Sequence, residues 1–264
     1  MAFARVNGIT LHYQVSGAKE LPPLVFSNSL GTDLRIWDKV AERLAGRFRL
    51  IRYDNRGHGL SEDPPPPYPL TDHVADLVGL LDHLEIDRTA MVGLSVGGMI
   101  AQGLATLHPE RVAALVLSDT APKIGTTESW NDRIDLVMRQ GLAVLVERVM
   151  PLWFTPAFRK QDNPDYAGCV AMFTRTPVDG YVGTCASVRD ADLTEATRAL
   201  KVPTLCIVGE QDGSTPPDLV RSLAKLISNS EFRIIPNAGH IPCVEQPDVF
   251  VGLVGGFLRN AHYG

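Results

Sequence analysis

The stretch Gly93-Leu94-Ser95-Val96-Gly97 decides the fold of this chain. It follows a strand-like run, residues 89–92, and precedes a helix-like run, residues 98–107. A serine in that position needs a sharp turn, and the flanking glycines allow one because a Cβ there would clash with neighbouring elements. The turn holds the serine oxygen out from the sheet, and the helix N-terminus directs backbone N–H groups at whatever reacts with it. The pattern predicts a nucleophilic serine; a glycine-rich turn with an incidental serine is the alternative.

Strand-like and helix-like runs alternate on both sides of this turn. Strands are expected at residues 3–6, 9–15, 24–27, 49–53, 89–92, 112–117, 204–208 and 231–235, and helices at 36–44, 71–84 (capped by Thr71), 98–107, 217–227 and 247–259. Apolar strands alternating with helices predict an α/β fold with a mostly parallel, eight-stranded sheet covered on both faces. The hairpin around Asn7-Gly8 is expected at one edge.

Residues 122–195 break this alternation, because they are helical and irregular and rich in Trp, Phe, Met and Pro. We interpret them as an inserted helical cap on a core made of residues 1–121 and 196–264. Several large apolar side chains of the cap suit either a pocket wall or the cap's own core: Trp153, Phe154, Phe158, Met172 and Phe173.

Composition narrows the class of protein. The chain has 264 residues, 45% of them hydrophobic, which suits one α/β domain with an insertion. The net charge is −5 without a basic block, so nucleic acid is not an expected partner. No apolar run reaches the ~18–20 residues of a membrane span, and no signal peptide is evident. Four cysteines without metal-binding spacing are expected to be free thiols in a cytoplasmic protein: Cys169, Cys185, Cys206 and Cys243.

A serine nucleophile needs a base, and the base needs an orienting acid. In parallel sheets reactive groups gather at the carboxyl ends of the strands. Of the seven histidines, only His58 and His240 directly follow predicted strands. His240 is the predicted base, and Gly239 before it leaves room for the imidazole to reach over the sheet edge. His58 lies among small residues and is interpreted as structural.

The acid is sought by the same rule. Asp212 follows the strand at residues 204–208 and is favoured, with Asp119 and Glu210 as the alternatives. The order Ser95…Asp212…His240 is the one expected of this architecture. Two backbone N–H groups should stabilise the oxyanion of a tetrahedral intermediate: that of Val96, and that of Leu30 in the loop after the strand at residues 24–27.

Together these residues resemble the α/β-hydrolase family over nearly the whole chain. The resemblance is carried by Tyr53-Asp54-Asn55-Arg56-Gly57-His58-Gly59-Leu60-Ser61, Gly93-Leu94-Ser95-Val96-Gly97-Gly98-Met99, Gly209-Glu210-Gln211-Asp212 and Ala238-Gly239-His240. One departure is visible: many members have His-Gly before the first oxyanion donor, where this chain has Asn28-Ser29.

A finer resemblance, to 3-oxoadipate enol-lactonases, is carried by residues 93–102, 176–186 and 189–193. It implies hydrolysis of a small anionic enol-lactone in bacterial breakdown of protocatechuate and catechol, which makes that lactone the expected partner. The predicted reaction is acyl transfer through Ser95, assisted by His240 and Asp212, without a metal or organic cofactor.

The substrate carboxylate needs a cation near the site. Arg133, close behind Trp130, is the candidate, because an aromatic ring beside an arginine suits a flat anionic ring. Lys123 and Arg189 compete with it for this role. The alternative for each is a solvated or salt-bridged surface cation.

Other functions stay open at this point. The same residues suit a general carboxylesterase, a cofactor-free perhydrolase or haloperoxidase, or a hydrolase-like small-molecule receptor that is not an enzyme. Enzymes with an aspartate nucleophile are disfavoured, because this chain has Ser95 at that position. The sequence carries no indication of the oligomeric state.

Overall fold

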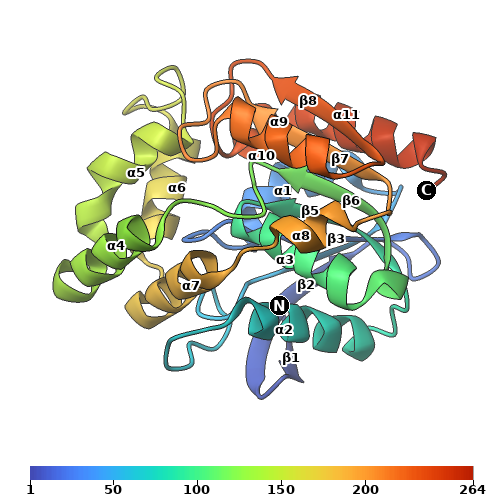
Figure 1. Cartoon of the computed structure of the whole chain (residues 1–264), viewed down its shortest axis with the longest axis horizontal. Coiled ribbons are helices and arrows are strands. Elements are labelled where there is room, and N and C mark those ends of the chain that lie inside the picture. The colour runs from blue at the N-terminus through green and yellow to red at the C-terminus, as the bar shows by residue number, and fades with distance from the viewer. Residues whose placement is uncertain (264) are drawn as a thin grey trace.

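The centre of the molecule is an eight-stranded sheet, seen in a computed structural model that describes residues 1–263 (Figure 1). The strands are β1 (Ala2–Val6), β2 (Ile9–Ser16), β3 (Pro23–Ser27), β4 (Arg49–Tyr53), β5 (Thr89–Leu94), β6 (Val112–Ser118), β7 (Thr204–Gly209) and β8 (Ser230–Ile235). Their order across the sheet is β1-β2-β4-β3-β5-β6-β7-β8.

The pairing of the strands confirms the predicted α/β architecture. β1 pairs with β2 and β2 with β4 in antiparallel fashion, and every later pair is parallel. The hairpin lies at the edge, and its turn places Asn7 and Gly8 at φ 44° and 80°, the backbone that this dipeptide favours. Because β3 to β8 run parallel, the loops after them emerge at the same edge.

Helices cover both faces of the sheet. Within residues 1–263 they are η1 (Leu34–Trp37), α1 (Asp38–Leu44), α2 (Leu70–His83), α3 (Val96–Leu107), η2 (Pro109–Arg111), α4 (Thr127–Gln140), η3 (Leu142–Leu145), α5 (Val146–Trp153), α6 (Pro164–Thr174), α7 (Val178–Asp190), α8 (Thr194–Arg198), α9 (Pro217–Leu226), α10 (Pro242–Glu245) and α11 (Pro247–Asn260). α2 begins at Leu70 and its N-cap is Pro69, so the expectation that Thr71 caps this helix is wrong. Thr71 lies within the first turn instead.

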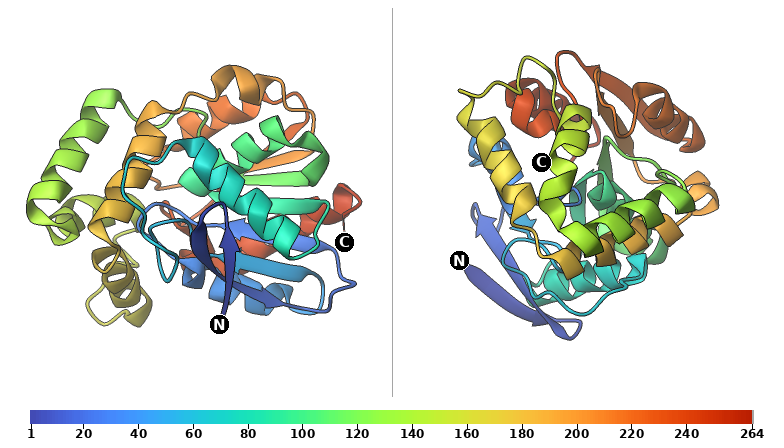
Figure 2. Two further views of the ribbon diagram at one scale, coloured as in Figure 1. Left: turned by 90° about the horizontal axis from the view of Figure 1, so that it is seen from below. Right: turned by 90° about the vertical axis from the view of Figure 1, so that its left-hand side faces the viewer.

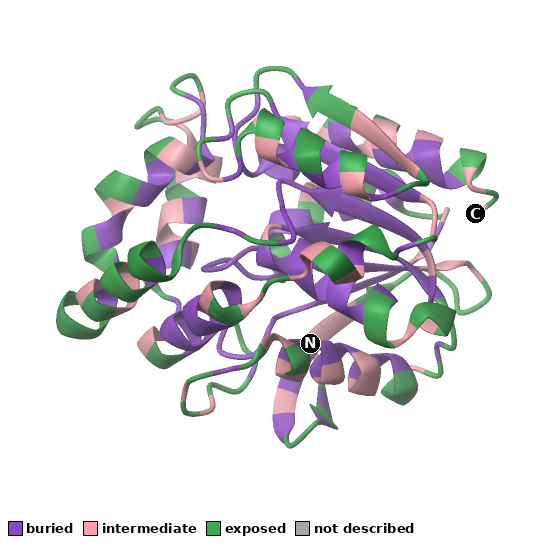
Figure 3. Ribbon diagram, viewed as in Figure 1, coloured by how far each residue is buried: buried purple, intermediate pink, exposed green. Residues whose placement is uncertain are grey.

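Side chains alternate along each central strand between two buried clusters. In β3, Leu24 and Phe26 join a cluster with α1 and α11, whereas Val25 joins a cluster with α2, α3 and α9. This alternation is the period of two that strands impose. All of these strand residues are buried, and Figure 3 shows the central strands in purple, whereas the edge strand β8 is partly exposed.

The helices from α4 to α7 follow β6 and lie to one side of the sheet (Figure 1). The right-hand view of Figure 2 looks onto them. Apolar residues of these helices, among them Val137, Phe173 and Tyr181, belong to the same buried cluster as α1 and α11. The helices therefore pack onto one end of the core. None of the helices described in residues 1–263 is both long and apolar enough to cross a bilayer.

Candidate active site

Ser95 occupies a strained turn between β5 and α3. Its backbone lies at φ 57° and ψ −118°, a region that non-glycine residues rarely adopt. The turn is anchored at both ends, because Ser95 N–H donates to Ser118 O at 3.0 Å and Thr120 Oγ1 donates to Ser95 O at 2.7 Å. A Cβ on Gly97 would collide with the carbonyl oxygen of Ser27. The glycine is thus required by the close approach of β3.

Asp212 and His240 come together because the loops after β7 and β8 are joined. Gln211 N–H donates to Ala238 O at 2.8 Å, and a Cβ on Gly209 would collide with Gly239 O. In this arrangement His240 Nδ1 lies 2.9 Å from Asp212 Oδ2. Both side chains are buried.

Asp212 is held as a carboxylate by four donors. Its Oδ1 accepts from the N–H groups of Ser214 and Thr215 at 2.7 and 3.0 Å, and its Oδ2 accepts from Thr215 Oγ1 at 2.6 Å as well as from His240. Burial alone would raise the pKa of Asp212, but His240 and these hydrogen bonds outweigh it, so that the pKa lies below its ordinary value. An ionised Asp212 can orient the imidazole and stabilise an imidazolium.

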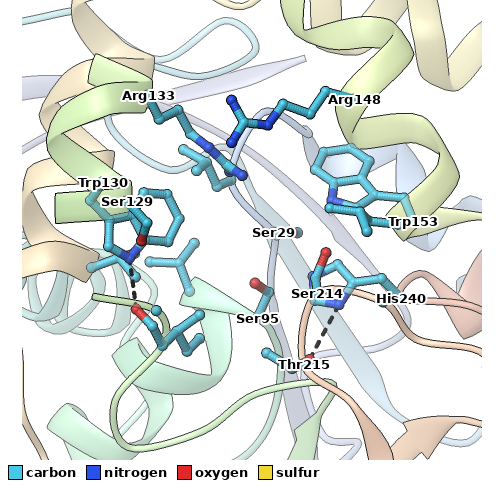
Figure 4. Close-up of a pocket in the computed structure, with 17 residues that line it drawn as sticks. Ser29, Ser95, Ser129, Trp130, Arg133, Arg148, Trp153, Ser214, Thr215 and His240 are labelled. Carbon is cyan, nitrogen blue, oxygen red and sulfur yellow. Dashed lines mark hydrogen bonds between the residues drawn. The ribbon is translucent and has the colours of Figure 1, made fainter. Parts of the chain in front are cut away.

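Ser95 and His240 line one cavity of about 180 Å³ (Figure 4). Its walls come from the Ser95 turn, from α4, α5 and α7, and from the loops after β3, β6, β7 and β8. The residues that line it are Ser29, Leu30, Ser95, Val96, Ile124, Gly125, Ser129, Trp130, Arg133, Arg148, Leu152, Trp153, Val188, Gly213, Ser214, Thr215 and His240. This volume is below the ~300 Å³ at which pockets for drug-sized ligands begin.

The two predicted oxyanion donors, Leu30 and Val96, both line this cavity. Within residues 1–263 neither N–H donates to another protein group, since Val96 begins α3 and its N–H has no intrahelical partner. Two free N–H groups beside Ser95 can receive a negatively charged oxygen.

The loop that carries Leu30 is fixed by buried side chains. Asn28 Nδ2 donates to Tyr53 O at 2.7 Å, and Asn28 Oδ1 accepts from Trp37 Nε1 at 2.8 Å. His58 Nδ1–H donates to Arg56 O at 3.0 Å, and His58 Nε2 accepts from Gly31 N–H at 2.9 Å. Burial lowers the pKa of His58, which keeps it neutral and able to accept that bond. His58 therefore supports the backbone of the loop and is absent from the residues that line the cavity.

The two alternative acids lie in different places. Glu210 is exposed and its Oε2 accepts from Asn237 N–H at 3.2 Å, so it stays away from the cavity. Asp119 is fully buried, and one of its oxygens lies within 4.8 Å of ligand atoms of both Asp212 and His240. The structure thus brings Asp119 to the site without a hydrogen bond to His240.

Arg133 and Trp130 project from α4 into the cavity. The Arg133 guanidinium lies over the Trp130 ring, with Cζ 4.8 Å from its centroid. The two competing cations are engaged elsewhere: Lys123 pairs with Asp192 at 3.2 Å, and Arg189 pairs with Asp190 at 2.7 Å. Neither is among the residues that line the cavity.

Arg148, on α5, is a second cation of the cavity that the sequence did not point to. Figure 4 shows Arg133 and Arg148 reaching toward each other on the side of the cavity opposite Ser95. No ion pair engages either guanidinium within residues 1–263, and no aspartate or glutamate of that range lines the cavity. The two charges therefore face a space that suits an anion.

Of the five large apolar residues singled out in the sequence, only Trp153 lines the cavity. Its ring stacks on His240 at a centroid distance of 6.2 Å, and its carbonyl oxygen accepts from His240 N–H at 2.8 Å. Phe154, Phe158, Met172 and Phe173 pack in the core beside it. A Cβ on Gly239 would collide with the Trp153 carbonyl, so this glycine makes room for the end of α5. That it also makes room for the imidazole stays a prediction.

Known proteins with similar sequences belong to a family that shares this architecture. The profile of the alpha/beta hydrolase family matches residues 24–253. The chain is 35% identical to 3-oxoadipate enol-lactonase 2 of Acinetobacter baylyi over 253 residues, which cover 96% of this chain and 94% of the relative.

Solved structures show the same likeness. The crystal structure of the enol-lactonase from Burkholderia xenovorans LB400 superposes with a TM-score of 0.95 at 36% identity, covering 98% of this chain and 100% of the other. A malate-bound thermophilic esterase from Thermogutta terrifontis superposes with a TM-score of 0.93 at 28% identity, covering 99% and 100%.

The fold and the Ser95 turn define a class of α/β proteins that carry a serine on a sharp strand-to-helix turn. The chain belongs to the alpha/beta hydrolase family.

Proposed function

We propose that this protein hydrolyses a small, carboxylated enol-lactone, namely 3-oxoadipate enol-lactone, through a serine acyl-enzyme, as a step in the breakdown of aromatic compounds. The observation that carries the proposal is the polarity of the cavity. Ser95 and His240 lie at one side, and at the other lie two arginines that have no ionic partner among residues 1–263. A carboxylate bound by the arginines would place the ester carbon of a short substrate beside Ser95. The enol-lactonase relatives support the same substrate class.

In the proposed mechanism His240 takes the proton of Ser95 as its oxygen attacks the lactone carbonyl. Asp212 holds the imidazole by its Nδ1–H and stabilises the imidazolium. The N–H groups of Leu30 and Val96 receive the developing oxyanion. As the tetrahedral intermediate collapses, the ring C–O bond breaks and the enol oxygen takes the proton from His240.

The opened enol then tautomerises to a ketone while it remains bound as an acyl-enzyme. His240 takes a proton from water, whose oxygen attacks the acyl carbon, and the proton returns to Ser95 as the acid is released. The product carries a second carboxylate, formed at the position of the former ester.

We also propose that residues 122–195 act as a cap that selects the substrate, with a core formed by residues 1–121 and 196–264. Three of its helices, α4, α5 and α7, contribute side chains to the cavity. Both tryptophans and both arginines of the cavity come from α4 and α5. The catalytic groups, by contrast, come from the loops after the strands.

The test compares two substrates with purified protein: 3-oxoadipate enol-lactone and the neutral ester p-nitrophenyl acetate. We expect kcat/KM for the lactone to exceed that for the aryl ester by ~100-fold or more, because only the lactone uses the arginine side of the cavity. Comparable values would identify a general carboxylesterase instead.

The Ser95→Ala variant should lose ~10⁵-fold or more in kcat on both substrates while it keeps its melting temperature within a few degrees. Wild-type turnover by that variant would contradict the nucleophile assignment.

A further inference from the structure

A second buried carboxyl lies beside Asp212. Asp119 follows β6, the strand between β5 and β7, and its backbone lies at φ 48°, in the left-handed region. Its Oδ1 accepts from Gly209 N–H at 2.8 Å and its Oδ2 accepts from Ser118 Oγ at 2.6 Å. One ligand atom each of Asp119, Asp212 and His240 lie within 4.8 Å of one another.

The residues around Asp119 and Asp212 do not stabilise a negative charge on both carboxyls at once. Both carboxyls are buried, and within residues 1–263 no lysine or arginine pairs with either one. Asp212 receives four hydrogen bonds, one of them from His240, whereas Asp119 receives two. Like charges this close in a buried site cannot both ionise easily, and the better-solvated group keeps the charge.

We propose that Asp119 is a positioning residue for the catalytic acid: its carboxyl stays protonated beside the ionised Asp212, and it takes over the orientation of His240 when Asp212 is neutralised. In that event Asp119 gives its proton to solvent, and its carboxylate accepts the Nδ1–H of His240. One carboxyl oxygen of Asp119 and one ring nitrogen of His240 already lie within 4.8 Å, so a shift of about 2 Å in side-chain position brings the carboxylate into hydrogen-bond range. The inference rests on the serine mechanism of the proposed function.

The other titratable groups around Asp119 favour the same distribution of charge. Burial and the neighbouring Asp212 raise the pKa of Asp119 well above its ordinary value. The Cys243 thiol of α10 also faces this carboxyl, and burial together with Asp119 raises the pKa of Cys243, which keeps the thiol neutral. His240 is the remaining titratable group near Asp119, and its Nδ1 is hydrogen-bonded to Asp212.

A double-mutant cycle on p-nitrophenyl acetate tests the proposal. Asp119→Asn should cost about fivefold in kcat in the wild-type background, the effect of one weakened neutral hydrogen bond. Asp212→Asn should cost ~10²-fold, and the double variant ~10⁴-fold, the loss known when a triad has no acid. Asp119→Asn is thus expected to be far more harmful when Asp212 is absent.

The pH profile gives a second, independent readout. The residual activity of Asp212→Asn should rise with pH across the range in which the wild type is constant, because Asp119 must first lose its proton. An equal effect of Asp119→Asn in both backgrounds, or a residual activity that does not change with pH, would overturn the inference. The profile of the single Asp212→Asn variant decides the matter even if the double variant does not fold. Full activity of Ser95→Ala would instead mean that the proposed function itself is wrong.

Discussion

Arg133 and Arg148 come from different helices, and neither guanidinium forms an ion pair within residues 1–263. Arg133 is half-buried and lies over the Trp130 ring, whereas Arg148 is exposed. A guanidinium that is partly desolvated binds a carboxylate more strongly than one in full contact with water. The two arginines should therefore contribute unequally to substrate binding.

We expect Arg133→Ala to raise KM for the enol-lactone about 10–100-fold, the cost of one charge-assisted hydrogen bond. Arg148→Ala should raise it by only about two- to fivefold, because this exposed cation is screened by solvent. KM for the neutral p-nitrophenyl acetate should change little in both. The matched control is Arg139→Ala, which removes an exposed arginine of α4 that does not line the cavity. A change of less than twofold for Arg133→Ala would remove it from the binding site.

Sequence reasoning could find Arg133 because an aromatic residue stands three positions before it on the same helix, which places the two side chains together. Arg148 offers no such local sign. It reaches the cavity only because η3 contacts both α4 and α5 and turns the chain back toward the site. That arrangement is not encoded by the spacing of any motif. The assignment of both residues to a carboxylate stays a prediction.

At the scale of elements, the loop that carries His240 is tied to the end of α5. The Glu245 carboxylate accepts from Thr155 N–H at 3.0 Å, from Thr155 Oγ1 at 2.8 Å and from Gly239 N–H at 2.5 Å. Together with the bond from His240 N–H to Trp153 O, these contacts fix His240, the proposed base, against the helix that carries Arg148. We therefore expect the position of His240 to depend on Glu245, an acidic side chain outside the cavity.

The Glu245→Gln variant tests whether the hydrogen bonds of Glu245 matter for stability and for kcat. The amide group would face Gly239 N–H, donor against donor, and leave a buried N–H unpaired at a cost of about 1–3 kcal/mol. We expect the free energy of unfolding to fall by that amount and kcat to fall severalfold. Urea unfolding and steady-state kinetics measure both. Glu210→Gln is the control, since Glu210 binds the same loop from an exposed position and should have almost no effect. Equal effects of the two substitutions would contradict the proposed link.

The elements themselves were largely predictable. The eight strands and the edge hairpin are confirmed, because apolar runs of strand length, separated by turn residues, mark buried parallel strands. Helix starts were less predictable. Thr71 is of a type that commonly caps helices, yet it lies inside the first turn of α2, because the helix begins directly after Pro69.

The site was predictable in part. The strand-end rule placed Asp212 and His240 on neighbouring loops, yet it could not show that Asp119 would lie within 4.8 Å of both.

At the scale of the whole molecule, His73 joins the sheet-covering helix α2 to α7. It is buried, and its Nε2 lies 3.2 Å from Ser187 Oγ. Burial, followed by the nearby Arg56, lowers the pKa of His73 well below its ordinary value. A histidine that stays neutral in the folded state and becomes charged in the unfolded chain makes the protein less stable as the pH falls below about 6.5.

We expect His73→Gln to remove this acid sensitivity, because its amide can donate to Ser187 in the same way. Between pH 7.5 and 5.5 the free energy of unfolding of the wild type should fall by about 1.4 kcal/mol more than that of the variant, the effect of one proton over one pH unit. Urea unfolding at both pH values measures the difference. The control is His108→Gln, which replaces a partly exposed histidine that follows α3. Parallel curves for His73→Gln would show that His73 is not the group that titrates.

The charge of the cavity also bears on how a catalytic cycle would end. Opening the ring turns a monoanion into a dianion, so a chamber whose described lining contains two guanidinium groups and no carboxylate attracts the product more strongly than the substrate. Departure of the product, not cleavage of the C–O bond, would then limit turnover. Added salt, which screens such attraction, would speed the enzyme at saturating lactone while it weakens capture of the lactone at low concentration.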